Sequence, residues 1–88
     1  MADAIGTPRQ IVVAVVGDGD PRGPDAHRIL EWAEELGQLI ARGGAAVVTG
    51  GLGGVMRAAS RGAISGGGFT IGILPGDDPH EANEYVRL

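Results

Sequence analysis

The sequence predicts an α/β fold of the Rossmann-like, three-layer type, with a short parallel sheet built in the order β-α-β-α-β. Three apolar runs with strand composition, at residues 11–16, 45–48 and 69–74, alternate with two segments of helical periodicity. Glycine or proline turns separate the segments. Such alternation is typical of parallel strands joined by right-handed crossover helices.

Length limits the chain to one small domain. With 88 residues it buries only about 60–65% of the surface of its unfolded form. Residues 1–9 offer nothing to pack and are expected to be a flexible N-terminal segment. Residues 10–88 are expected to form one Rossmann-like nucleotide-binding half-domain.

Composition excludes several classes of function. A net charge of -4 leaves no broad basic face for a nucleic acid backbone. The chain has no lysine, so the P-loop lysine is missing, and no cysteine, so thiolate chemistry and disulfides are excluded. Neither a signal peptide nor a membrane span is recognisable, and a cytoplasmic location is expected.

A run of β-branched residues predicts the first strand, and apolar residues at helical spacing predict the first helix. Ile11–Val16 is a continuous β-branched run, which suggests a strand buried on both faces. After a turn-rich stretch, Asp25, or Gly23 with Pro24, is placed to cap a helix that ends at Arg42 and is stopped by Gly43-Gly44. The expected inward face of this helix is Ala26, Ile29, Leu30, Ala33, Leu36 and Ile40.

The second helix is expected from Gly54 to Ser65, with Gly62 close against the sheet. Its expected inward face is Val55, Met56, Ala59 and Ala63. After the third strand, Asp77 to Leu88 is expected to form a polar turn, about one helical turn and the start of an extended piece.

The stretch with the clearest chemistry is the glycine turn between the second strand and the second helix. Gly50, Gly51, Gly53 and Gly54 fall within five positions. A helix start carries unpaired backbone amides and partial positive charge, so glycines there let a phosphate approach the main chain. The spacing does not match G-x-G-x-x-G, and a tight turn that needs positive φ is the alternative explanation.

Other polar residues near the carboxyl ends of the strands have two interpretations. Asp18, after the first strand, either accepts a hydrogen bond from a ribose hydroxyl or is a solvated turn residue. Arg57 and Arg61 either lie close enough to bind an anion at the glycine turn or are solvated helix arginines, which is the commoner case.

The acidic segment after the third strand invites a metal hypothesis that the sequence does not favour. The segment His80-Glu81-Ala82-Asn83-Glu84 begins like the H-E-x-x-H zinc helix, but Glu84 stands in the position of the second histidine. Pro79 favours a short capped turn instead. No metal site is predicted.

Several of these segments resemble one family of Rossmann-like proteins. Residues 33–43, 67–76 and 82–86 and above all Thr49-Gly50-Gly51-Leu52-Gly53-Gly54-Val55-Met56 are similar to the LOG family, formerly labelled lysine decarboxylase-like, and to DprA/Smf. The branch that resembles molybdenum cofactor carrier proteins is the most similar. The resemblance covers about residues 11–87.

The resemblance implies a pocket for a nucleotide or another phosphorylated ligand. Together with Asp18 and the first helical residues, the glycines make the expected ligand site: Gly17, Asp18, Gly50, Gly51, Gly53, Gly54, Val55 and Met56. Active LOG enzymes carry P-G-G-x-G-T-x-x-E, whose glutamate is catalytic, and Pro75-Gly76-Asp77-Asp78-Pro79-His80 departs from it. No catalytic residue is therefore assigned, and the chain looks like the N-terminal half of a longer ancestor or gene product.

The sequence thus favours a protein that binds a nucleotide or phosphorylated cofactor without complete catalytic machinery. The ligand expected is a nucleoside monophosphate or a molybdopterin-type phosphate. Alternatives are a nucleoside 5′-monophosphate phosphoribohydrolase completed by a partner or missing half, a molybdenum cofactor carrier, and an inert fragment. Three strands leave exposed edges, so homo-oligomerisation is also expected.

Overall fold

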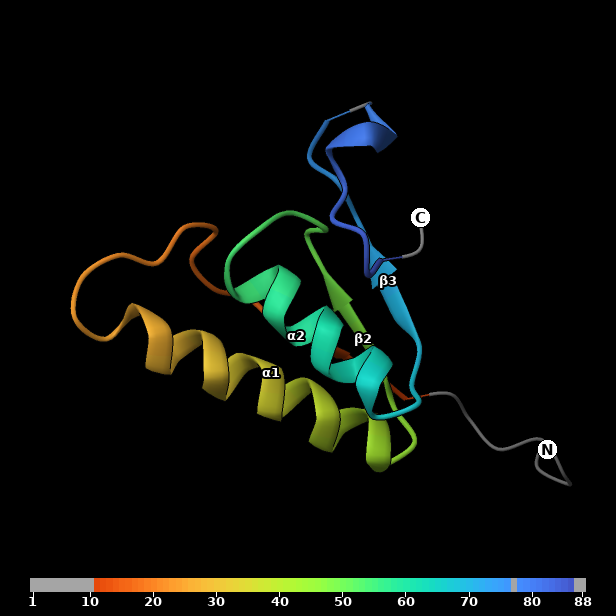
Figure 1. The fold of residues 1–88 in the computed structure, drawn as a ribbon. Coiled ribbons are helices and arrows are strands. Elements are labelled where there is room, and N and C mark those ends of the chain that lie inside the picture. The colour runs from red at the N-terminus through yellow and green to blue at the C-terminus, as the bar shows by residue number, and fades with distance from the viewer. Residues whose placement is uncertain (1–10, 77, 87–88) are drawn as a thin grey trace, which may run out of the picture.

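The computed structural model describes residues 11–76 and 78–86, which form a three-stranded sheet and two long helices (Figure 1). The strands are parallel in the order β1-β2-β3, with Val13 beside Val47 and Val47 beside Thr70. This arrangement confirms the α/β class. The elements in chain order are β1 (Val12–Ala14), α1 (Ala26–Arg42), β2 (Ala46–Thr49), α2 (Val55–Ser65), β3 (Thr70–Gly72) and the 3₁₀ helix η1 (Pro79–Glu81).

Both helices lie on the same face of the sheet (Figure 1). Right-handed crossovers that step in one direction, from β1 to β2 and from β2 to β3, place both connections on one side. The described residues therefore form two of the three expected layers. The expectation that the first strand is buried on both faces is wrong, because β1 is an edge strand covered on one face. Val12 is accordingly 47% exposed.

Helix α1 begins and ends as the sequence predicts, with Gly44 in the left-handed conformation after it (φ +87°). Asp25 occupies the N-cap position, although its side chain forms no capping hydrogen bond. The inward face differs from the expected one. Ala33 and Gly37 are buried, whereas Ile29 and Leu36 are exposed, because α1 turns its glycine toward α2.

The two helices touch backbone to backbone at two glycines. A Cβ at Gly37 would overlap the carbonyl oxygen of Ala59, and one at Gly62 would overlap the carbonyl oxygen of Glu34. Gly62 was expected against the sheet, and the structure places it against α1 instead. Contacts of this kind leave no room for a side chain at either glycine.

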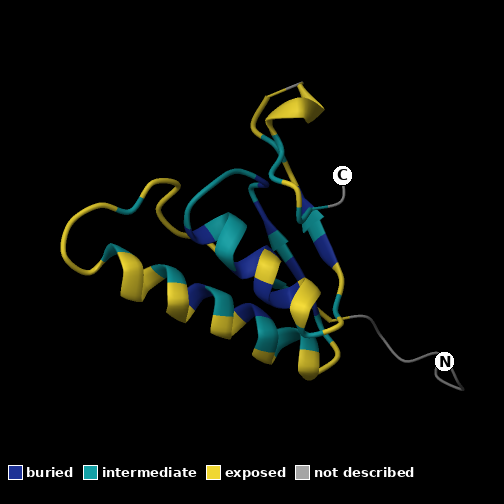
Figure 2. Ribbon diagram, in the orientation of Figure 1, coloured by how far each residue is buried: buried dark blue, intermediate teal, exposed yellow. Residues whose placement is uncertain are grey.

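The buried segments of the helices and strands face one another (Figure 2), and the core between them is made of small residues. Buried Val47 of β2 packs there with Ala59 and Ala63 of α2, and Met56, which was expected inward, is only partly buried. Thr49, Ser60 and Thr70 are buried as well, which patterning alone did not indicate.

The C-terminal segment forms the expected single helical turn as η1. Asp78 caps it by accepting a hydrogen bond from the amide of His80 at 2.9 Å, with Pro79 at its first position. Residues 85–86 are not in a strand, and the rest of the expected extended piece lies outside the described residues. No helix in residues 11–76 and 78–86 is both long and apolar enough to cross a bilayer.

Replacing either contact glycine tests the helix packing. Gly37→Ala and Gly62→Ala should each lower the free energy of unfolding by about 1–3 kcal/mol, as overpacking typically does. The loss should appear although alanine favours a helix over glycine by about 1 kcal/mol. Urea denaturation followed by circular dichroism measures the difference.

Gly43→Ala is the matched control, since a Cβ there meets only carbonyls of its own helix, at 3.5 Å. Its stability should stay within about 0.5 kcal/mol of the parent. Equal stability of all three variants would contradict a backbone contact between α1 and α2.

Candidate functional site

Two loops meet at the carboxyl edge of the sheet, as the sequence predicts from its topology. The amide of Val55, the first residue of α2, donates to the carbonyl oxygen of Asp18 at 2.9 Å. A Cβ at Gly54 would overlap that same carbonyl, and Gly54 has φ +62°. A side chain at this position is therefore excluded both by the backbone conformation and by the neighbouring loop.

The other glycines of the expected site also make close approaches. A Cβ at Gly17 would lie 2.6 Å from Val55 Cγ1, and one at Gly53 would lie 3.3 Å from the carbonyl oxygen of Gly19. At Gly50 the neighbour is Met56 Sδ, at 3.0 Å. Gly51 adopts φ +79° and its amide donates to the buried hydroxyl of Thr49 at 3.0 Å. The predicted site residues thus come together in space.

The amides of this turn differ in what they donate to. Val55 and Gly51 have partners within the protein, as described above. Within the described part of the chain, nothing accepts a hydrogen bond from the amides of Leu52, Gly53 and Gly54. The first turn of α2 has neither an acidic residue nor a side-chain cap. Its partial positive charge is therefore left uncompensated by the helix itself.

Asp18 lies at this edge but acts as a turn residue. Its Oδ1 accepts a hydrogen bond from the amide of Asp20 at 2.8 Å, and the side chain is exposed. This is an Asx turn, which matches the plainer of the two interpretations of Asp18.

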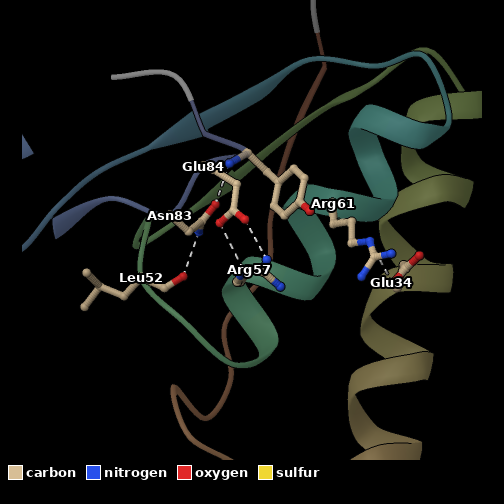
Figure 3. Close-up of polar contacts among 7 residues, drawn as sticks. Glu34, Leu52, Arg57, Arg61, Asn83 and Glu84 are labelled. Carbon is tan, nitrogen blue, oxygen red and sulfur yellow. Dashed lines mark hydrogen bonds and ion pairs between the residues drawn. The ribbon is translucent and has the colours of Figure 1, made fainter. Parts of the chain in front are cut away.

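A residue that sequence reasoning missed holds the turn from the other side. The amide of Asn83 donates to the carbonyl oxygen of Gly51 at 2.7 Å. Its Nδ2 donates to the carbonyl oxygen of Leu52, also at 2.7 Å (Figure 3). Asn83 Oδ1 in turn accepts from the amide of Tyr85. The sequence offered a signal for this local Asx turn, but none for a contact across 31 residues.

Arg57, in the first turn of α2, is held by the same C-terminal segment. Its Nε and Nη2 donate to the two carboxylate oxygens of Glu84, at 3.1 and 2.7 Å, and its guanidinium lies 5.0 Å from the centre of the Tyr85 ring (Figure 3). Arg61 points to α1 instead, 3.8 Å from Glu34. The two arginines therefore do not converge on the glycine turn.

The Arg57 hydrogen bond holds the pKa of Glu84 below its ordinary value, and the same bond raises the pKa of Arg57. Both side chains are substantially exposed, so water and salt screen the pair.

A cavity of about 280 Å³ opens beside the turn, between the first halves of the two helices. Its charged lining is mixed, with Arg57 and Arg61 facing Glu31 and Glu34, and Gly54 forms its end nearest the turn. Such a lining offers no single sign of charge to a ligand.

The acidic C-terminal residues do not converge on a metal position. His80 Nδ1 lies 3.0 Å from Asp78 Oδ1, and the described residues contain no cluster of three or more potential ligands. Asp77 lies outside the described residues.

The Glu84 titration tests the Arg57 contact. Because the pKa of Glu84 is lowered in the folded state, the contact is complete at neutral pH and is lost as the pH falls through that lowered pKa. Carbon-detected NMR should find the Glu84 midpoint below those of exposed glutamates. Arg57→Gln should return it to the ordinary range, and Arg22→Gln, which removes an exposed pair with Asp20, should not. An ordinary midpoint in the parent protein would contradict the contact.

Known proteins are similar to this chain in sequence, and two solved structures among them are similar to it in fold. The molybdenum cofactor binding protein of the phototrophic bacterium Rippkaea orientalis is 41% identical, with a TM-score of 0.80, over 91% of this chain and 48% of that one. The Moco carrier protein of Chlamydomonas reinhardtii is 40% identical, with a TM-score of 0.79, over 91% and 48%. An Archaeoglobus fulgidus protein is 43% identical over 63 residues, 72% of this chain and 39% of that one.

The chain therefore spans about half the length of the solved structures that it matches. Residues 10–88 match the SLOG cluster4 family, which covers nearly the whole sequence, including both loops of the sheet edge and the Asn83 segment. The resemblance inferred from the glycine turn is thereby confirmed, and the chain belongs to the SLOG cluster4 family.

Proposed function

We propose that this chain binds the phosphate group of a small ligand at the glycine turn, and that the ligand is a molybdopterin-type phosphate rather than a nucleoside monophosphate. The observation that carries the proposal is the set of amides at Leu52, Gly53 and Gly54, for which the described residues supply no acceptor. They stand at the positive end of α2, where an anion is stabilised.

The donor set fits a phosphate better than a cation or an apolar group. Backbone N–H groups only donate, and a phosphate oxygen only accepts. Gly53 and Gly54 have no side chain over these amides, so an anion reaches the backbone directly. Asp18, whose carboxylate already accepts from Asp20, stays at the border of the site.

The names of the solved relatives support the choice of ligand. The Chlamydomonas reinhardtii and Rippkaea orientalis proteins are described as carrying or binding the molybdenum cofactor, and this chain matches 48% of each. The pterin would be cargo, since the proposed role of these residues is to hold its phosphate without chemical change. The rest of the pterin ring would need surfaces beyond the glycine turn.

Glycosidic hydrolysis of nucleoside monophosphates has less support. That reaction needs a carboxyl group placed as acid or base at the bond to be cleaved. The described carboxylates of the segment after β3 are all exposed: Asp78 caps η1, Glu81 ends it and Glu84 pairs with Arg57. Exposed side chains of this kind lack the enclosed setting that acid–base catalysis commonly uses.

Isothermal titration calorimetry with a pterin phosphate and with AMP tests the proposal. Binding of the pterin phosphate should be tighter, and Gly53→Asp should weaken it about tenfold, ~1.4 kcal/mol, because a carboxylate would stand beside the phosphate. Gly53→Asn is the matched control, of equal size and no charge, and should retain most of the affinity.

Three results would contradict the proposal. The parent protein binding neither ligand would remove the site, and equal weakening by Gly53→Asp and Gly53→Asn would indicate a steric effect alone. Release of free adenine from AMP would favour the hydrolase.

A further inference from the structure

Two successive carbonyl groups of the glycine turn face one residue of the C-terminal segment. The carbonyl oxygen of Gly51 accepts from the main-chain amide of Asn83 at 2.7 Å. The carbonyl oxygen of Leu52 accepts from Asn83 Nδ2, also at 2.7 Å (Figure 3). Main chain and side chain of a single residue, which follows η1, therefore hold two peptide groups of the turn at once.

These two hydrogen bonds fix the direction of the amides that follow each carbonyl. Every peptide bond within residues 11–76 and 78–86 is trans, and in a planar trans peptide the C=O and N–H groups point in opposite directions. Because the carbonyls of Gly51 and Leu52 face Asn83, the amides of Leu52 and Gly53 face away from it. Successive amides that point to one side form a concave surface suited to an anion.

Asn83 is itself held in place by its own segment. Its Oδ1 accepts from the amide of Tyr85 at 2.9 Å, which orients the side-chain amide with Nδ2 toward the turn. The carbonyl oxygen of Tyr85 accepts from the buried hydroxyl of Thr70, and Glu84 pairs with Arg57. The segment is thus attached to β3 and to α2, and Asn83 is a fixed pair of donors.

We propose that Asn83 is the positioning residue of the glycine turn: it aims the amides of Leu52 and Gly53 at a phosphate group that it does not itself contact. Both nitrogens of Asn83 donate to carbonyls on the other side of the turn, so the residue acts through the main chain. The inference rests on the proposed function for its ligand, whereas the orientation of the two amides is a property of the chain alone.

This turn needs such a residue because glycines stand on both sides of Leu52. Gly51 and Gly53 can each adopt positive or negative φ at little cost, so either peptide group could turn over. A peptide group that turned over would present a carbonyl oxygen to the phosphate, and two acceptors repel. Asn83 prevents this by bonding both carbonyls, and donors that are ordered beforehand lose little freedom when the ligand binds.

Nuclear magnetic resonance on the full chain tests the inference, with inorganic phosphate as the probe. In the ligand-free parent the amides of Leu52 and Gly53 should have the order parameters of rigid backbone, about 0.85. Asn83→Ala should lower both below about 0.6, because the turn loses the Nδ2 donor and the Asx turn that places the Asn83 amide. Phosphate should bind this variant about tenfold more weakly than the parent, or weaker still.

Thr70→Val is the matched control. It removes the hydroxyl that donates to Tyr85 and so loosens the same segment, but it leaves both contacts from Asn83 to the turn in place. Its phosphate affinity should stay within about twofold of the parent, with the order of the Leu52 and Gly53 amides unchanged.

Asn83→Ser serves as a second variant, which decides the question if Asn83→Ala does not fold. A serine hydroxyl can still accept from the amide of Tyr85, as in an ST turn, but it is too short to reach the carbonyl of Leu52. It should therefore lower the amide order and weaken phosphate binding as the alanine variant does.

The outcomes separate this inference from the proposed function. Unchanged amide order or unchanged phosphate affinity in the Asn83 variants would overturn the positioning role and leave the proposed function standing. Equal weakening by Thr70→Val would overturn it too, since a loosened segment would then explain the loss. A parent whose ordered amides bind neither inorganic phosphate nor a pterin phosphate would overturn the proposed function, and with it the role of Asn83 toward a ligand.

Discussion

The close approach of α1 and α2 is the constraint on which the rest of this structure depends. The chain has few large apolar residues in its core, so the layers are stable only if they come close enough for small side chains to fill the space between them. Gly37 and Gly62 allow this, because each faces a carbonyl group of the other helix. The resulting position of α2 fixes where its first turn meets the sheet edge.

That edge is built from main chain more than from side chains. The bond from the Val55 amide to the Asp18 carbonyl ties the loop after β1 to the start of α2, and Asn83 ties the glycine turn to the C-terminal segment. These contacts hold the turn in one conformation and still leave Leu52, Gly53 and Gly54 with amides free among the described residues. A rigid set of donors of this kind suits recognition of a phosphate, since little is lost in ordering it.

The distribution of exposed apolar residues fits the length of the relatives. The two solved relatives described above have about twice the length of the part they share with this chain. Among residues 11–76 and 78–86, nothing covers the outer edge of β1 or the face of the sheet opposite the helices. An α/β sheet with helices on one face leaves apolar strand residues such as Val12 in water, which costs free energy until another layer covers them.

The sequence by itself determined the order of the elements, the limits of α1 and α2 to within a residue and the glycine turn, because periodicity, caps and turn residues act over short distances. It also indicated that the Gly17-Asp18-Gly19 turn would lie beside the glycine turn, since parallel strands end at one edge. The tertiary structure alone decided that β1 is an edge strand, that α1 turns Gly37 rather than Leu36 inward, that Gly62 faces α1 and that Asn83 holds the turn. Burial and hydrogen bonding at these positions depend on residues far away in the chain, and a local pattern carries no information about such partners.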